Sequence, residues 1–152
     1  MQKAKQADFT VFDASAWRVG IVVAMFNRDI TNQLLQSALA RAKAYTIPDA
    51  QIEVIKVAGA VEIPLVLQNL AKSNKYDVLL AIGCVVEGET AHFDYVCKFV
   101  TDGVLAVQLK HNMPIGFGVL ACRNIAQAKE RAKLGGEHLD AVMHQVKVIK
   151  QI

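Results

Sequence analysis

One stretch decides the fold, the segment GCVVEGETAHFDYV at residues 83–96. It completes an apolar run from Tyr76 that predicts a buried strand, turns at residues 87–90, and enters a helix that starts near His92. The first N–H groups of a helix lack internal partners and carry the positive end of its dipole, so this turn can hold an anion beside the imidazole. Taken alone, the pattern fits a capped helix equally well, with Thr90 near the N-cap.

The rest of the chain repeats this strand–helix order. A nearly continuous β-branched run at residues 18–25 is typical of a strand buried on both faces of a parallel sheet. The expected strands are 18–25, 52–57, 76–86 and 113–120, and helices follow each, the last region starting at Asn124 and breaking near 134–136. Right-handed crossovers make this an α/β fold, flavodoxin-like, with three α/β/α layers and a four-stranded parallel sheet flanked by helices.

Polar turns follow three of the strands, at residues 26–29, 58–62 and 87–92. The carboxyl ends of parallel strands share one edge, where ligands bind in open α/β sheets, so the topology gathers these turns. Phe26 is then either a ligand contact or a core residue. Glu62 is either a partner of the helix dipole or a carboxylate aimed at polyol hydroxyls.

Three local signals carry an expectation each. Asn27 or Asp29 is expected to cap the first helix. Gly59 permits a tight turn or the close approach of a ligand. Phe117 stands between two glycines, which either leave room for a flat group beside the ring or bend the strand.

The length and composition indicate one domain with a substantial core. The chain has 152 residues, of which 53% are apolar, and that fraction is high for a small monomer and favours self-association. Residues 1–17 are interpreted as an N-terminal arm, either frayed or paired with a neighbouring subunit. Residues 18–152 form the single expected domain.

The charge and the cysteines exclude several function classes. The net charge of +3 is too slight to indicate nucleic acid, and the longest apolar runs fall far short of the roughly 20 residues of a membrane helix. No apolar run follows the polar first eight residues, so no signal peptide is predicted. Cys84, Cys97 and Cys122 are odd in number and lack metal-ligand spacing, which favours reduced thiols in the cytoplasm and no metal.

Five motifs in a fixed order resemble those of the lumazine synthase family, over about residues 18–146. They are Phe26-Asn27; Gly59-Ala60 with Glu62-Ile63-Pro64; Gly88-Glu89-Thr90 with His92-Phe93-Asp94-Tyr95-Val96; Pro114-Ile115-Gly116-Phe117-Gly118-Val119-Leu120; and Glu130-Arg131-Ala132. The resemblance implies a transferase of riboflavin biosynthesis without cofactor or metal. In that reaction 5-amino-6-(D-ribitylamino)uracil condenses with 3,4-dihydroxy-2-butanone 4-phosphate, phosphate leaves, and 6,7-dimethyl-8-ribityllumazine forms.

The resemblance also implies a role for each matching residue. Phe26 would stack on the pyrimidine, and Phe117 would cover the ring from the adjacent subunit. The ribityl-bearing substrate would be bound by Ala60, Val61 and Glu62. The uracil site would be lined by backbone groups of Cys84, Val85 and Val86. Glu89 and Thr90 would cradle the phosphate with Arg131 as counter-charge, and His92 would shuttle protons. An imidazole suits proton transfer near neutral pH. No P-loop lysine precedes the helix at His92, so a leaving phosphate needs a positive charge from elsewhere in the chain. Arg131 can supply it.

The chain departs from the family pattern at several positions. Glu87 stands where an Arg is usual, Val61 replaces an aromatic residue, and the loop at 133–137 is shortened and lacks the family's Lys. That loop accompanies the sixty-subunit shells of some members, so its loss favours a pentamer or a pair of pentamers with active sites between subunits. Riboflavin synthase is a further candidate partner.

Two other functions fit parts of the sequence. A catalytically weakened relative would bind riboflavin or a lumazine as a carrier, which the shortened loop and Val61 favour. An unrelated flavodoxin-like phosphate-binding module would explain the fold. It would not explain why Glu62, His92 and Arg131 occur together.

Overall fold

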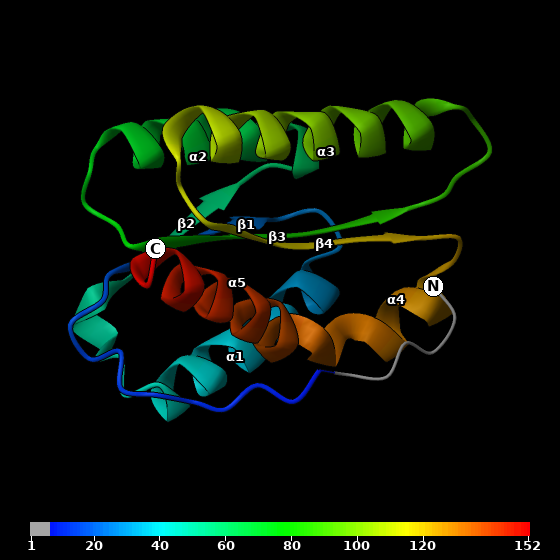
Figure 1. The fold of residues 1–152 in the computed structure, drawn as a ribbon. Helices are drawn as coiled ribbons and strands as arrows, with labels where there is room; N and C mark the ends of the chain where they lie inside the picture. Colours follow the sequence, from blue (N-terminus) through cyan, green and yellow to red (C-terminus); the bar gives the residue numbers. More distant parts are fainter. Residues whose placement is uncertain (1–6) are drawn as a thin grey trace.

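A computed structural model describes residues 7–152 of the chain. Four strands alternate with helices in the expected order (Figure 1). The elements are β1 (Val19–Ala24), α1 (Arg28–Ala44), β2 (Ile52–Val57), α2 (Ile63–Lys72), β3 (Val78–Val86), α3 (His92–His111), β4 (Ile115–Cys122), α4 (Ile125–Arg131) and α5 (Gly135–Lys150). Short 3-10 turns precede β2 and α2 and join α4 to α5. No helix within residues 7–152 is both long and apolar enough to cross a membrane.

The sheet is parallel throughout and has the strand order β2-β1-β3-β4. Every residue of β1 is buried, because β1 and β3 are central strands with helices on both faces. The edge strand β2 is exposed or half-buried up to Lys56, and only its last residue, Val57, is buried. The chain moves to one side of β1 to form β2 and then crosses to the other side to form β3. The topological switch point therefore lies between β1 and β3, where open α/β sheets bind ligands.

Helices cover both faces of the sheet (Figure 1). We call α1, α4 and α5 the closed layer, and α2 and α3 the open layer. The core under the closed layer includes Leu34, Leu80 and Met143, and the core under the open layer includes Leu67, Leu79 and Val100. Both layers thus bury aliphatic side chains against the same two central strands, which confirms the three-layer fold class.

Close helix packing depends on a glycine in each layer. A Cβ at Gly135 would lie 1.8 Å from the Leu34 carbonyl oxygen, so α5 begins directly against the backbone of α1. A Cβ at Gly103 would lie 2.7 Å from the Pro64 ring, so α3 packs tightly on the first turn of α2. Pro64 occupies that first turn as expected, since its missing N–H has no helical partner there.

The described part of the N-terminal segment lies along the closed layer of its own chain. Phe12 packs edge-on against Trp17 and Tyr45, at centroid distances of 5.2 and 5.1 Å, and Phe9 lies 5.4 Å from His144. No strand forms at residues 9–12, because these aromatic rings pack on helices rather than at a sheet edge. Residues 1–6 of the expected arm lie outside the described residues.

Candidate functional site

A cleft of about 540 Å³ opens at the carboxyl ends of β1, β2 and β3, beside the switch point. The turns after all three strands contribute to it, as the topology predicted. Its lining residues are Phe26, Asn27, Gly59, Ala60, Val61, Glu62, Cys84, Val85, Val86, His92 and Val96. Eight of the twelve expected site residues therefore meet in one cavity, although they come from three separate segments of the chain.

An aromatic ring stands at the mouth of this cleft. Phe26 is 69% exposed, which excludes a role in the core. Its N–H donates to the Ala58 carbonyl at 3.1 Å, and a Cβ at Gly59 would come within 2.7 Å of its ring. Gly59 is thus required for close approach to Phe26 rather than for a turn. The ring presents a free apolar surface on which a planar ligand can stack.

Glu62 supplies the carboxylate of the cleft. Its Oε2 accepts the Gly59 N–H at 2.8 Å, across the 3-10 turn Ala60–Glu62 that leads into α2. This bond fixes the carboxylate at the end of the turn and leaves Oε1 available to another donor. The residue is exposed, so it can meet hydroxyl groups of a ligand without first giving up a buried partner.

The floor of the cleft is the end of β3. The Cys84 side chain belongs to the core under the closed layer, whereas Val85 packs toward the open layer, so the backbone of this stretch faces the ligand space. Burial, with a smaller contribution from Cys122, raises the pKa of the Cys84 thiol to about 11. Burial also raises the pKa of Cys122 and Cys97. All three thiols stay protonated near neutral pH and are poor nucleophiles.

His92 is the first residue of α3 and also lines the cleft. Its N–H lies 3.4 Å from the Thr90 hydroxyl oxygen. Thr90 lies near the N-cap as expected, since the N-cap position is Ala91 and Thr90 stands one residue earlier. The first N–H groups of a 20-residue helix face this loop, and such groups can donate hydrogen bonds to an anion beside the imidazole.

Four expected site residues do not line the cleft: Glu89, Thr90, Phe117 and Arg131. Glu89 and Thr90 are exposed in the loop just before α3. Phe117 lies on the edge strand β4 and is 41% exposed. Arg131 ends α4, where its guanidinium donates to the Gln127 carbonyl at 3.3 Å. The chain alone thus brings eight of the expected residues into one cleft and leaves the other four spread along one edge.

One ion pair adjoins that edge. Arg123 Nη1 lies 3.3 Å from Glu87 Oε2, and the Glu87 N–H donates to the Cys122 carbonyl at 2.8 Å. The unusual Glu87 is therefore neutralised by a neighbour beyond β4. Both side chains are substantially exposed, so this pair contributes at most about 1 kcal/mol to stability.

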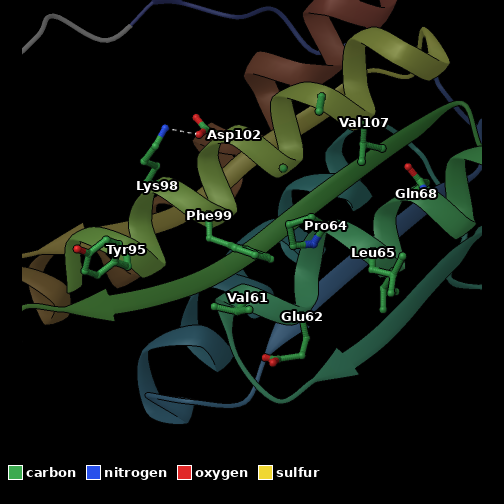
Figure 2. A pocket seen from close by; sticks show the side chains of 13 residues that line it. Val61, Glu62, Pro64, Leu65, Gln68, Tyr95, Lys98, Phe99, Asp102 and Val107 are labelled. Atoms are coloured by element: carbon green, nitrogen blue, oxygen red, sulfur yellow. Dashed lines mark hydrogen bonds and ion pairs between the residues drawn. The ribbon is translucent and has the colours of Figure 1, made fainter. Parts of the chain in front are cut away.

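A larger groove of about 990 Å³ runs between α2 and α3 in the open layer (Figure 2). Its walls are mainly apolar, with Leu65 from α2 and Tyr95 and Phe99 from α3, and these three side chains are 66%, 72% and 55% exposed. Figure 2 shows Phe99 and Pro64 between the two helices, with Val61 and Glu62 at one end. Val61 and Glu62 line the cleft as well, so the groove and the cleft are contiguous.

The sequence interpretation missed the role of Asn27. It occupies the N-cap position of α1, but its side chain makes no capping bond there, and Asp29 lies within the helix. Instead its Nδ2 donates to the Cys84 carbonyl at 2.8 Å, across the switch point. An Asn directly after a strand fits a cap equally well, so only the placement of β3 beside β1 distinguishes the two roles.

Both a family model and known proteins match most of this chain. The model of a family described as 6,7-dimethyl-8-ribityllumazine synthase matches residues 16–150. A protein from Desulfovibrio desulfuricans with the same description is 39% identical over 145 residues, which cover 92% of this chain and 93% of that protein. The matched range of the family model includes all four strands and every residue of the cleft.

Proposed function

This chain belongs to the 6,7-dimethyl-8-ribityllumazine synthase family, a family of transferases in riboflavin biosynthesis, and on that premise we propose that its cleft catalyses the condensation. The substrates are 5-amino-6-(D-ribitylamino)uracil and 3,4-dihydroxy-2-butanone 4-phosphate. The observation that carries the proposal is the convergence of Phe26, Glu62 and His92 from three segments on one cavity. The carrier alternative receives no support from either match.

The pyrimidine substrate binds in the cleft. Phe26 stacks on its ring, because the exposed phenyl face needs a planar partner. Ala60, Val61 and Glu62 bind the ribityl chain, with Glu62 accepting from its hydroxyls through the oxygen that Gly59 leaves available. Cys84, Val85 and Val86 offer backbone groups to the uracil edge.

The phosphate substrate binds at the adjoining edge. Glu89 and Thr90 form the cradle through their backbone N–H groups, and the N-terminus of α3 adds the positive end of its dipole. Arg131 supplies the counter-charge, with the departing phosphate between α3 and α4. This arrangement needs no metal, because the leaving group is held by a cation and by backbone donors.

His92 moves the protons of the condensation. The substrate amine attacks the ketone, loss of water gives a Schiff base, phosphate leaves, and ring closure with loss of a second water gives the lumazine. Each of these steps transfers a proton near the imidazole at the first turn of α3. General acid–base catalysis contributes about 10²–10⁴-fold in favourable cases, and holding both substrates together supplies much of the rest.

The family implies small-molecule substrates and oligomeric assembly. We place the contact in the open layer, as a pentamer or a pair of pentamers rather than a sixty-subunit shell, in the cytoplasm and with riboflavin synthase as a further partner. A neighbour that fills the apolar groove meets Val61 and Glu62, which also belong to the cleft. Phe117, which lines no part of its own cleft, then covers the ring bound by the adjacent subunit.

The direct test is to incubate purified protein with both substrates and follow lumazine absorbance. We expect a rate well above the spontaneous condensation. His92→Ala should lower kcat by about one to two orders of magnitude, less than general acid–base catalysis reaches elsewhere, because the uncatalysed reaction is appreciable. A wild-type rate equal to the spontaneous one would remove the enzyme function and leave the carrier alternative.

The phosphate half has a test of its own. Arg131→Ala should raise the KM for the butanone phosphate about tenfold or more, since a charge-assisted hydrogen bond is worth about 1.5–3 kcal/mol. The KM for the pyrimidine should change little. Lys129→Ala, an exposed cation on the same helix, is the matched control. Equal increases in both KM values would show that Arg131 does not bind the phosphate.

A further inference from the structure

Asn27 has a backbone conformation that is uncommon for a residue other than glycine. Its φ and ψ are 55° and 47°, in the left-handed region, at the junction of β1 and α1. Asn tolerates this region better than most residues. Asn74, in the turn between α2 and β3, also has a positive φ of 56°, so the conformation alone carries no function. The hydrogen bond of the Asn27 side chain distinguishes the two residues.

That hydrogen bond continues the β1–β3 ladder past the end of β1. The register pairs Val23 with Ile82 and ends there, so the Cys84 carbonyl projects toward β1 where no strand follows. Asn27 Nδ2 donates to this carbonyl at 2.8 Å and replaces the absent strand partner. An unpaired carbonyl here would compete for the ligand or remain unsatisfied.

The same bond determines which backbone groups remain for a ligand. Backbone groups along a strand alternate in direction, and the Glu87 N–H donates to Cys122 on β4. The N–H and carbonyl of Val86 therefore point to the same side as the Cys84 carbonyl, into the cleft. Asn27 occupies the first of these positions and leaves Val86 as an open donor–acceptor pair at the cleft floor.

Asn27 also sets the position of Phe26. The preceding residues are bonded to the β2 turn, where Met25 N–H donates to the Val57 carbonyl at 2.8 Å and Phe26 N–H to the Ala58 carbonyl at 3.1 Å. The Asn27 side chain ties the same turn to β3 on its other side. The backbone on either side of Phe26 is thus held from β2 and from β3, and the ring and Val86 line the same cleft.

We infer that Asn27 is a positioning residue for the pyrimidine substrate, holding the Phe26 ring and the Val86 backbone groups at the spacing that a flat, hydrogen-bonding heterocycle needs. This inference rests on the proposed function for the identity of the ring. It predicts that Asn27 affects the binding of the pyrimidine alone. The proposed phosphate position is at the N-terminus of α3, which Asn27 does not contact through this hydrogen bond.

The test uses Asn27→Gly, which keeps the left-handed backbone and removes only the amide. We expect the KM for the pyrimidine to rise about tenfold, as for loss of a hydrogen bond of ordinary strength. The KM for the butanone phosphate should stay unchanged, and the thermal midpoint should fall by no more than a few degrees, since one part-buried hydrogen bond contributes about 0.5–1.5 kcal/mol. Asn74→Gly makes the same change in a distant turn and should alter neither. Asn27→Asp should weaken pyrimidine binding further, because a carboxylate repels the Cys84 carbonyl.

A double-mutant cycle identifies the route of the effect. If Asn27 acts through the ring, Asn27→Gly adds much less to a Phe26→Ala variant than to the wild type. Equal changes in both KM values, or a lower thermal midpoint with unchanged KM values, would overturn the inference. If Phe26→Ala raises the pyrimidine KM while Asn27→Gly does not, the inference fails and the proposed site stands. If Phe26→Ala has no effect, the proposed site fails.

Discussion

The closed and open layers cover the same sheet in different ways. In the closed layer, α1 and α5 are joined by a polar network in which the Asp140 carboxylate accepts from Arg41 Nε and from the Tyr45 hydroxyl, both at 2.7 Å. Residues 7–17 pack over the outer side of these helices. In the open layer, Tyr95, Phe99 and Leu65 remain exposed along an apolar groove.

This difference locates stability and function on opposite faces of the sheet. The closed layer joins α1 and α5 through a polar network within one chain, and residues 7–17 cover part of its outer side. The open layer borders the cleft through Val61 and Glu62, and its apolar groove lacks a cover within residues 7–152. Substitutions in the closed layer, apart from Arg131, should therefore act on the free energy of unfolding, whereas those in the open layer should act on assembly and activity.

Gly135→Ala should have the largest effect on the fold of the subunit. The new methyl group would lie 1.8 Å from the Leu34 carbonyl oxygen, so α5 would have to move away from α1. We expect a loss of about 3 kcal/mol or more of unfolding free energy in urea, at the upper end of overpacking effects. Gly88→Ala is the control, because its Cβ meets no atom within 4 Å. A change below about 1 kcal/mol in Gly135→Ala would show that the helix interface yields easily.

Asp140→Ala should have the next largest effect. Asp140 is 9% exposed, and its removal leaves the buried Tyr45 hydroxyl without its acceptor, at a cost of about 1–3 kcal/mol. The matching substitution in the open layer is Asp102→Ala, which removes an exposed pair with Lys98 at 2.6 Å. That pair should contribute less than about 1 kcal/mol in the same urea experiment. Equal losses would erase the distinction between the two layers.

Much of this architecture could be predicted from the sequence. The β-branched run of β1 and the apolar run of β3 fixed the central strands, and Pro64 and Asn124 marked two helix starts that the structure confirms. Side-chain partners across the fold could not be predicted, because they depend on which strands are neighbours. Asn27 is the clearest case, since its acceptor Cys84 is 57 residues away.

The site divides in the same way. Motif order predicted which residues meet in the cleft, since parallel topology brings the turns after β1, β2 and β3 to one edge. Topology within one chain could not predict the surroundings of Phe117 and Arg131, whose expected partners lie on another subunit or beyond β4. The apolar composition indicated self-association but not the face concerned. The exposed rings of Tyr95 and Phe99 are the reason that we propose the open layer as that face.

Acidification should lower the free energy of unfolding by a smaller amount. His138 of α5 packs against Gly118 of β4, its Nε2 is buried without a partner among residues 7–152, and burial lowers the pKa of its imidazole below 6.5. His138 lines a cavity that Arg41, Glu137 and Asp140 also line. The imidazole of His138 binds a proton more readily in the unfolded chain than in the folded one. The contribution of neutral His138 to stability is therefore complete above pH 6.5 and is lost as pH falls toward the lowered pKa.

The measurement for His138 is the urea unfolding free energy between pH 7 and pH 5, in wild type and His138→Gln. The slope should differ by at most about 1.4 kcal/mol per pH unit, the limit for one proton. His144, exposed on the same helix, provides the control His144→Gln, which should keep the wild-type slope. Identical slopes in wild type and His138→Gln would show that this imidazole does not couple protonation to the closed layer.

Phe99→Arg should have the smallest effect on the fold of the subunit. It tests most directly whether subunits contact one another through the open layer or the closed layer. Its ring is 55% exposed on the groove, so the change should leave the circular dichroism spectrum unaltered while a charge enters the apolar contact and yields a smaller species in sedimentation velocity. Val148→Arg places the same charge on an exposed apolar position of α5, at 42% exposure, and should keep the wild-type assembly. The reverse result would put the subunit contact on the closed layer and separate the groove from the shared site. Loss of activity together with assembly in Phe99→Arg would tie the cleft to its neighbour, because Phe99 itself does not line the cleft.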